Sequence, residues 1–348
     1  MENSSRLLDR LVAAGYPEEF ARASLPDWWS PEQESTTSGK TLVSLLLARR
    51  LGLNPETLLN DNVPVGFLHT GPTKFKHLRL GPGRQREALT AYSQGVARIV
   101  VAARRSVEAE PREVPPASEL RRQVLETGRD HVGFGDVLAT CWALDIPVVH
   151  LRMFPAATKG VTAMAVRSGQ RHVILVARNT GIEAQYMFHI AHELGHIALG
   201  HLRDAAAIID AETHDAGDLD AAPQLQDTSS PVDDEERAAD NYAQELLTGA
   251  KNFHVDRITL AANQGSGSAA ELATRALESG RELGIDAGHI VMCFGNTTKE
   301  WALAQSAAKL LPQQPERPGT MVNRALWDQL KDVPDQHSIA FLRAVAPA

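Results

Sequence analysis

Apolar residues recur at helical spacing through the first part of the chain. Two stretches show this spacing clearly: Leu7, Leu8 and Leu11, and the Leu-rich run of residues 42–53. The phrase LLARRLGLNPETLL places a glycine and an Asn-Pro start signal between two helices, as in a helix-turn-helix or any compact helical hairpin. We therefore predict a helical, helix-turn-helix-like module over residues 1–70, for which DNA contact is an open hypothesis.

The pattern changes between residues 71 and 118. The segment GPTKFKHLRLGPGRQR gathers five bases among Gly and Pro: Lys74, Lys76, Arg79, Arg84 and Arg86. It fits either a phosphate-contacting loop or a solvated loop between elements. Helical spacing returns over residues 87–105, and the Pro-rich stretch EAEPREVPPASE then predicts a linker to the next domain.

Residues 119–255 combine helices with short β-branched runs. The predicted strands are IPVVHL, TAMAVRS and RHVILVAR, with a tight turn at Ser168-Gly169 between the last two. The stretch EAQYMFHIAHELGHIALGH then predicts one long, largely apolar helix. Residues 203–236 are rich in Asp and Glu and predict a loop. Ser230-Pro231 supplies a cap and a first-turn proline for the helix DDEERAADNYAQELL.

Residues 256–348 predict a final helical module. Its helix ELATRALESGRELGI should end near Gly284, and Asp286 should cap the next helix, AGHIVMCF. Together these patterns predict an α+β fold. A small twisted sheet and its helices lie in the middle of the chain, between mainly helical N- and C-terminal modules.

Composition narrows the functional classes. The chain has 348 residues, enough for two or three domains, and its hydrophobic content of 43% is ample for buried cores. A net charge of −8 argues against nucleic-acid binding by bulk electrostatics. Cys141 and Cys293 form no disulfide framework, which fits a reducing compartment. The start is too charged for a signal peptide and no apolar run is long enough to span a bilayer, so we expect a cytoplasmic protein.

The pentapeptide His192-Glu193-Leu194-Gly195-His196 is the strongest indication of chemistry. On a helix, residues four apart lie on one face, so both imidazoles can point at one metal ion. Glu193 is rotated by about 100° and reaches the open metal position, where a general base for bound water belongs. The flanks FHIA and IALG are apolar, and burying two histidines and a glutamate without partners costs several kcal/mol. We therefore favour a metal site over surface histidines.

Zinc in a catalytic site needs a third protein ligand. The helix after the acidic stretch offers Glu235 and Glu236, and both border its apolar stripe. We favour Glu236, because Asp240 follows one turn later and can orient a ligand histidine, and we keep Glu235 as the alternative. The donor set accepts zinc, with manganese as a second option.

At this point the sequence strongly resembles a known family. The phrases HIAHELGHIALGH and EERAADNYAQELL are similar to the paired motifs of the ImmA/IrrE metallopeptidases, and the resemblance covers roughly residues 119–260. It implies a compact, gluzincin-like (zincin-like) domain, with zinc held by His192, His196 and Glu236 and with Glu193 as the catalytic base. It also implies a protein substrate, typically a helix-turn-helix repressor cut to release stress-response or mobile-element genes. The chain departs from the family pattern in its long acidic spacer and in Asp240, where Asn is common.

Several features of the expected reaction stay open in the sequence. Peptide hydrolysis needs a donor for the oxyanion besides the metal, and five residues qualify: Tyr186, His189, His201, His214 and Tyr242. We expect His201 simply to end its helix. An extended substrate could pair with a sheet edge, for which TAMAVRS is the expected strand.

The rival hypothesis is a DNA-binding transcriptional regulator or adaptor whose metal site is structural or vestigial. The helical N-terminus and the basic segment motivate it. A structural zinc site normally closes with four protein ligands, whereas we find three, which favours the enzyme.

Overall fold

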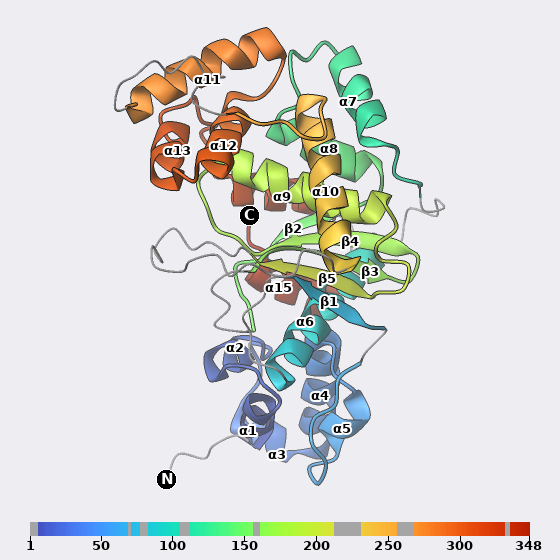
Figure 1. Ribbon diagram of the computed structural model, residues 1–348. Helices are drawn as coiled ribbons and strands as arrows, with labels where there is room; N and C mark the ends of the chain where they lie inside the picture. The colour runs from blue at the N-terminus through green and yellow to red at the C-terminus, as the bar shows by residue number, and fades with distance from the viewer. Residues whose placement is uncertain are drawn as a thin grey trace.

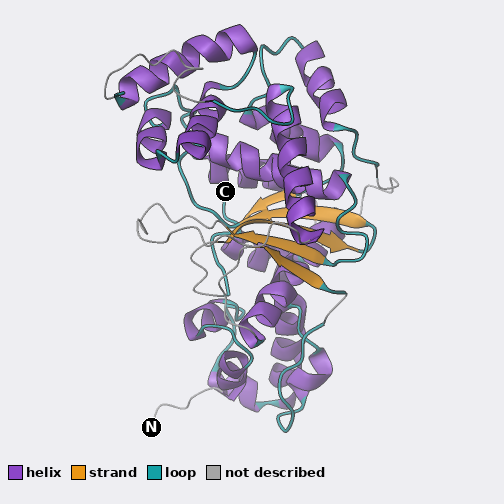
Figure 2. Ribbon diagram, in the orientation of Figure 1, coloured by secondary structure: helices purple, strands orange, loops and turns teal. Residues whose placement is uncertain are grey.

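The computed structural model describes residues 6–68, 71–76, 83–104, 112–155, 161–211, 231–255, 267–330 and 335–348. It confirms the α+β fold: a sheet lies in the middle of the molecule, with helices on both sides (Figures 1 and 2). On one side lie α1 (Arg6–Ala13), α2 (Glu18–Ala23), α3 (Pro31–Ser35), α4 (Thr37–Leu51), α5 (Pro55–Leu59), α6 (Arg84–Ala103) and α15 (Gln336–Val345). The other side carries α7 (Ala117–Glu126), α8 (Phe134–Ala143), α9 (Glu183–Ala198), α10 (Pro231–Thr248), α11 (Ala269–Leu283), α12 (Ala287–Thr298) and α13 (Trp301–Ala308), while α14 (Pro318–Gln329) packs against strand β2.

The described sheet is mixed and has the strand order β1-β5-β3-β4-β2. Its strands are β1 (Thr73–Lys76), β2 (Val148–His150), β3 (Val161–Ser168), β4 (Arg171–Val176) and β5 (Ala207–Ala211). β3 and β4 form the predicted hairpin, in which Gly169 adopts a positive φ of 65°. The prediction that TAMAVRS forms an edge is wrong. That segment is β3, and it pairs with β4 on one side and β5 on the other.

Both faces of the sheet are buried, which explains why its strands read as nearly continuous apolar runs. Successive side chains of a strand point to opposite faces. In β4, Val173 and Leu175 join the core shared with the N-terminal helices, whereas Ile174 and Val176 join the core under α9. The helix α6 packs against β3 and β4 on the first face, and α9 packs against the same strands on the second.

Two strands were not predicted. β1 lies within the predicted basic loop, and β5 lies within the acidic stretch that we predicted to be a loop. They pair with each other in parallel, and β5 then pairs antiparallel with β3. This pairing joins segments that lie more than 130 residues apart in the chain, so the local sequences TKFK and AIIDA do not predict it.

The outer edge of β2 is occupied by a side chain. At β2, the Asn323 side chain accepts from the His150 amide and donates to the His150 carbonyl, both at 2.9 Å, and so occupies that edge in place of another strand. Farther along the chain, α15 returns to pack on α4 and α6. The predicted boundaries at residues 70, 118 and 255 stay predictions.

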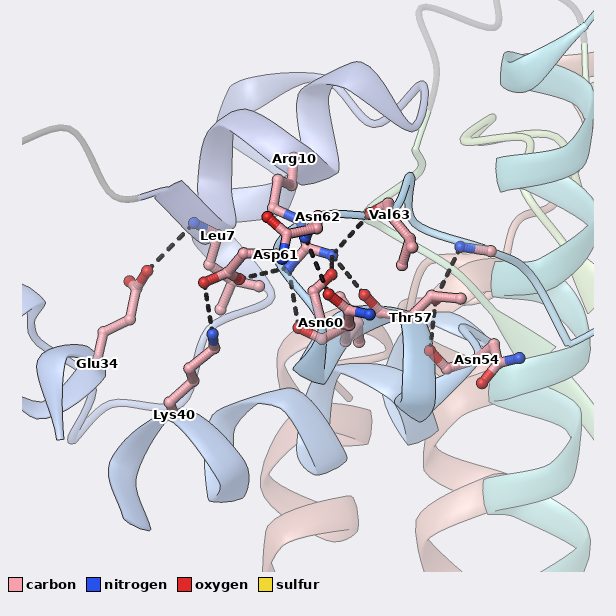
Figure 3. Close-up of polar contacts among 12 residues, drawn as sticks. Leu7, Arg10, Glu34, Lys40, Asn54, Thr57, Asn60, Asp61, Asn62 and Val63 are labelled. Carbon is pink, nitrogen blue, oxygen red and sulfur yellow. Dashed lines mark hydrogen bonds and ion pairs between the residues drawn. The ribbon is translucent and has the colours of Figure 1, made fainter. Parts of the chain in front are cut away.

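One arginine links α1 to the segment in and after α5 (Figure 3). The guanidinium of Arg10 donates to four backbone carbonyls at or after the end of the short helix α5: those of Thr57, Leu58, Asn60 and Val63. It also pairs with Asp61 at 3.1 Å, which in turn accepts from Lys40 at 2.6 Å. The hydrogen bond from Lys40 is the largest cause of the lowered pKa of Asp61. Because helix ends leave carbonyls without partners, Arg10 supplies donors that α5 needs.

Candidate metal centre

The helix α9 carries the pentapeptide across the second face of the sheet. It is buried along nearly its whole length, between the sheet and the neighbouring helices α8, α10 and α12. His192 is 5% exposed, and Glu193 and His196 are not exposed at all. The two histidines lie one turn apart, and their Nε2 atoms are 3.0 Å apart. The local geometry expected from the motif is therefore present.

The helix α10 crosses α9 at Gly195. A Cβ atom at Gly195 would lie 3.1 Å from the Ala239 carbonyl oxygen and 3.1 Å from the Tyr242 Cβ atom, so this glycine allows the two helices to touch. The close approach brings Glu236 over the histidine pair. Its Oε2 lies 3.4 Å from His192 Nε2, and its Oε1 lies 3.3 Å from His196 Nε2. The three side chains converge so that one ligand atom from each lies within 4.8 Å of the others, a group able to hold a metal ion.

Hydrogen bonds at the outer ring nitrogens show which atoms face the centre. His192 Nδ1 lies 2.9 Å from Asp240 Oδ1, and an ionised carboxylate only accepts, so this Nδ1 carries the proton. His192 Nε2 is then an acceptor, and it faces the Glu236 carboxylate, another acceptor. A divalent cation between these atoms would serve as the common partner of all three side chains. The donor set of two imidazole nitrogens and one carboxylate oxygen fits zinc.

Protonation also favours cation binding. Burial lowers the pKa of His196 to about 4, although the neighbouring Glu236 opposes this shift. The neutral imidazole that results is the form that binds metals. For Glu236, burial raises the pKa, but the close contacts with the imidazoles of His192 and His196 lower it more, and the net pKa lies well below the usual range. The carboxylate is therefore ionised.

Glu235 takes a different partner. Both of its carboxylate oxygens accept from Lys74 Nζ, at 2.6 and 2.8 Å, and Lys74 lies on β1. Of the two glutamates left open by the sequence, Glu236 is thus the one that faces the histidines. Its role as a ligand, like that of Asp240 as an orienting group, stays a prediction supported by this placement.

The structure also locates most of the candidate oxyanion donors. The hydroxyls of Tyr186 and Tyr242 donate to the carbonyls of Arg178 and Pro115. His201 contacts His196, as described below, and His189 lies on α9 one turn before His192 with 8% exposure. His214 lies outside the described residues.

Sequence reasoning missed the position of His201. We expected it simply to end its helix, rotated off the face that carries the ligands. Instead α9 ends at Ala198, Gly200 adopts a positive φ of 73°, and His201 Nδ1 comes within 2.8 Å of His196 Nδ1. The signal was present in the sequence, because glycine just after a helix is typical of a left-handed termination.

The basic segment is partly described. Lys74 pairs with Glu235, Arg84 donates to the Val65 carbonyl at 3.4 Å, and the Arg86 guanidinium lies over the Phe75 ring. Arg79 lies outside the described residues. These contacts within the chain weaken the interpretation of a phosphate-contacting loop.

No helix in the described ranges is both long and apolar enough to cross a membrane. No protein-family model matches the chain, and no curated protein or solved structure matches it either. What is shown is an α+β fold with a buried His192, His196 and Glu236 group that resembles an H-E-x-x-H metal site.

Proposed function

We propose that this chain is a zinc-dependent endopeptidase of the ImmA/IrrE type. The observation that carries the proposal is the convergence of His192, His196 and Glu236 at one point, with the fully buried Glu193 next to His192 on the same helix. Three protein donors leave a position for water and substrate, which is typical of catalytic rather than structural zinc sites.

Different residues of the chain have different roles in the proposed hydrolysis. When bound, zinc would lower the pKa of a coordinated water from about 15.7 to near 7 and polarise the substrate carbonyl. Glu193 accepts the proton of the attacking water and passes it to the leaving amine. Asp240 holds His192 through Nδ1, so that Nε2 faces the centre.

The substrate class rests on the sequence resemblance. It supports a regulatory protein, of the helix-turn-helix repressor kind, cut in a stress response or in the control of a mobile element. A DNA-bound repressor as substrate also supports a cytoplasmic location.

The test replaces the base and keeps the ligands. Glu193→Gln should retain metal but lose at least about a hundredfold in hydrolysis rate, as expected when a general base is removed. The substrate is a peptide pool derived from a whole proteome, and new N-termini are counted by mass spectrometry over time.

Glu282→Gln is the matched control, because Glu282 is exposed on α11, a helix that contributes none of the residues of the centre. It should cleave as the wild type does. Cleavage by Glu193→Gln at the wild-type rate would refute the assignment of Glu193 as the base.

A further inference from the structure

A histidine that binds metal through Nε2 needs its Nδ1 proton held by an acceptor, which fixes both the tautomer and the plane of the ring. Asp240 does this for His192. For His196, the group at that position is another histidine: His201 Nδ1 lies 2.8 Å from His196 Nδ1, and the ring centroids are 5.1 Å apart at 63°.

We propose that His201 is a positioning residue that holds His196 in the tautomer and orientation needed for metal binding. This role of His201 rests on the proposed metal site. His196 donates from Nδ1, so His201 accepts at Nδ1 and carries its own proton on Nε2.

The end of α9 explains how His201 reaches this position. The His201 amide donates to the His196 carbonyl at 3.0 Å, and the Gly200 amide donates to the Ile197 carbonyl at 3.1 Å. This pair of bonds around a left-handed Gly200 is the Schellman helix ending, which reverses the chain immediately after the helix. The reversal places the residue after the glycine back beside the helix residue five positions earlier. The helix ending therefore brings together both the backbones and the imidazole rings of His196 and His201.

A lysine from the sheet edge holds the reversed segment. Lys74 Nζ donates to the His201 carbonyl at 3.1 Å and pairs with Glu235 at the start of α10. Glu235 precedes Glu236 directly. Lys74 thus connects β1 to both parts of the centre: the segment that presents His201 and the helix that presents Glu236. It acts through the backbone of His201 and not on the metal.

The two possible roles of His201, hydrogen-bond acceptor or space-filling ring, make opposite predictions. His201→Phe keeps the ring and removes the acceptor, whereas His201→Asn removes the ring and places an amide oxygen near the position of Nδ1. If His201 positions His196, the Phe variant should bind zinc about 10- to 100-fold more weakly than the wild type, the usual cost of losing such a partner. The Asn variant should bind within about threefold of the wild type.

The measurement is zinc affinity by competition with a chromophoric chelator at one neutral pH, with circular dichroism of each metal-free variant as a check of folding. Lys74→Met should weaken zinc binding by less than His201→Phe does. The control Lys251→Met should not change it, because Lys251 is exposed and its pair with Glu245 is 3.9 Å long.

The outcomes separate this inference from the proposed function. A wild-type protein that takes up no zinc would refute the metal site itself. Zinc uptake by the wild type with equal affinity in His201→Phe, or a loss in His201→Asn as large as in His201→Phe, would refute the positioning role alone.

A measurement on the zinc-loaded wild type does not depend on whether the variants fold. Long-range nitrogen–proton NMR correlations of the imidazole rings should show His196 protonated at Nδ1 and His201 protonated at Nε2. His201 protonated at Nδ1 in that state would overturn the proposal.

Discussion

The contact between α9 and α10 at Gly195 predicts how a single methyl group would affect the metal centre. In Gly195→Ala the new Cβ would lie 3.1 Å from the Ala239 carbonyl oxygen and 3.2 Å from the Ala239 Cα. Non-bonded heavy atoms prefer about 3.5 to 4.0 Å, so α10 must move away by roughly 0.4 Å. The atoms in contact belong to a helix backbone and cannot rotate aside.

Glu236 lies one turn before Ala239 and moves with the helix. Metal–ligand distances tolerate only about 0.2 Å, so a shift of this size should weaken zinc binding about tenfold or more. Folding should survive. Overpacking costs about 1–3 kcal/mol, and the higher helix propensity of alanine returns about 1 kcal/mol. The free energy of unfolding should therefore fall by about 0–2 kcal/mol.

The assay combines zinc competition with urea denaturation of the metal-free protein. Gly135→Ala is the matched control, because Gly135 lies in α8 and a Cβ atom there would meet no described atom outside its own helix within 4 Å. It should leave zinc affinity unchanged. Wild-type zinc affinity in Gly195→Ala would show that the helix contact does not set the position of Glu236.

Two further predictions concern stability. Arg10→Ala should lower the free energy of unfolding by about 2–3 kcal/mol in urea, because carbonyls around α5 lose a charged donor. The control Arg22→Ala removes an exposed pair and should cost at most about 0.5 kcal/mol, and equal losses would contradict the role of Arg10. Burial lowers the pKa of His289 to about 4, so the unfolded chain takes up a proton before the folded one as pH falls. The free energy of unfolding should therefore fall as the pH drops from about 6.5 to 4. In urea titrations at several pH values, His289→Gln should reduce the slope of this free energy against pH by up to about 1.4 kcal/mol per pH unit. An unchanged slope would contradict this reasoning.

Elements whose pattern is local could be predicted from the sequence. The apolar runs of β2, β3 and β4, the helix α9 and the cap of α12 by Asp286 all appear where their residues indicate. β1 and β5 could not be predicted, because a basic and an acidic segment become strands only by pairing with each other far along the chain. The same pairing moves β3 from an edge to the centre of the sheet.

The metal site likewise combines residues that local spacing predicts with residues that it does not predict. Spacing alone placed His192, Glu193 and His196 together, because four residues make about one helical turn. Spacing could not choose between Glu235 and Glu236. That choice depends on which face of α10 packs against α9, which turns Glu236 toward the histidines. Glu235 instead pairs with Lys74, on a strand more than 150 residues earlier. His201 was misplaced for a local reason, since the helix was extended through Gly200 instead of ending before it.

The central claim is that His192, His196 and Glu236 hold a catalytic metal. Elemental analysis of the purified protein, beside His196→Ala and Glu236→Ala, tests it most directly. We predict about one zinc per chain in the wild type and loss of zinc in both variants, as expected for an open three-ligand site. A wild-type protein that contains no metal and cannot be loaded with zinc or manganese would contradict the account.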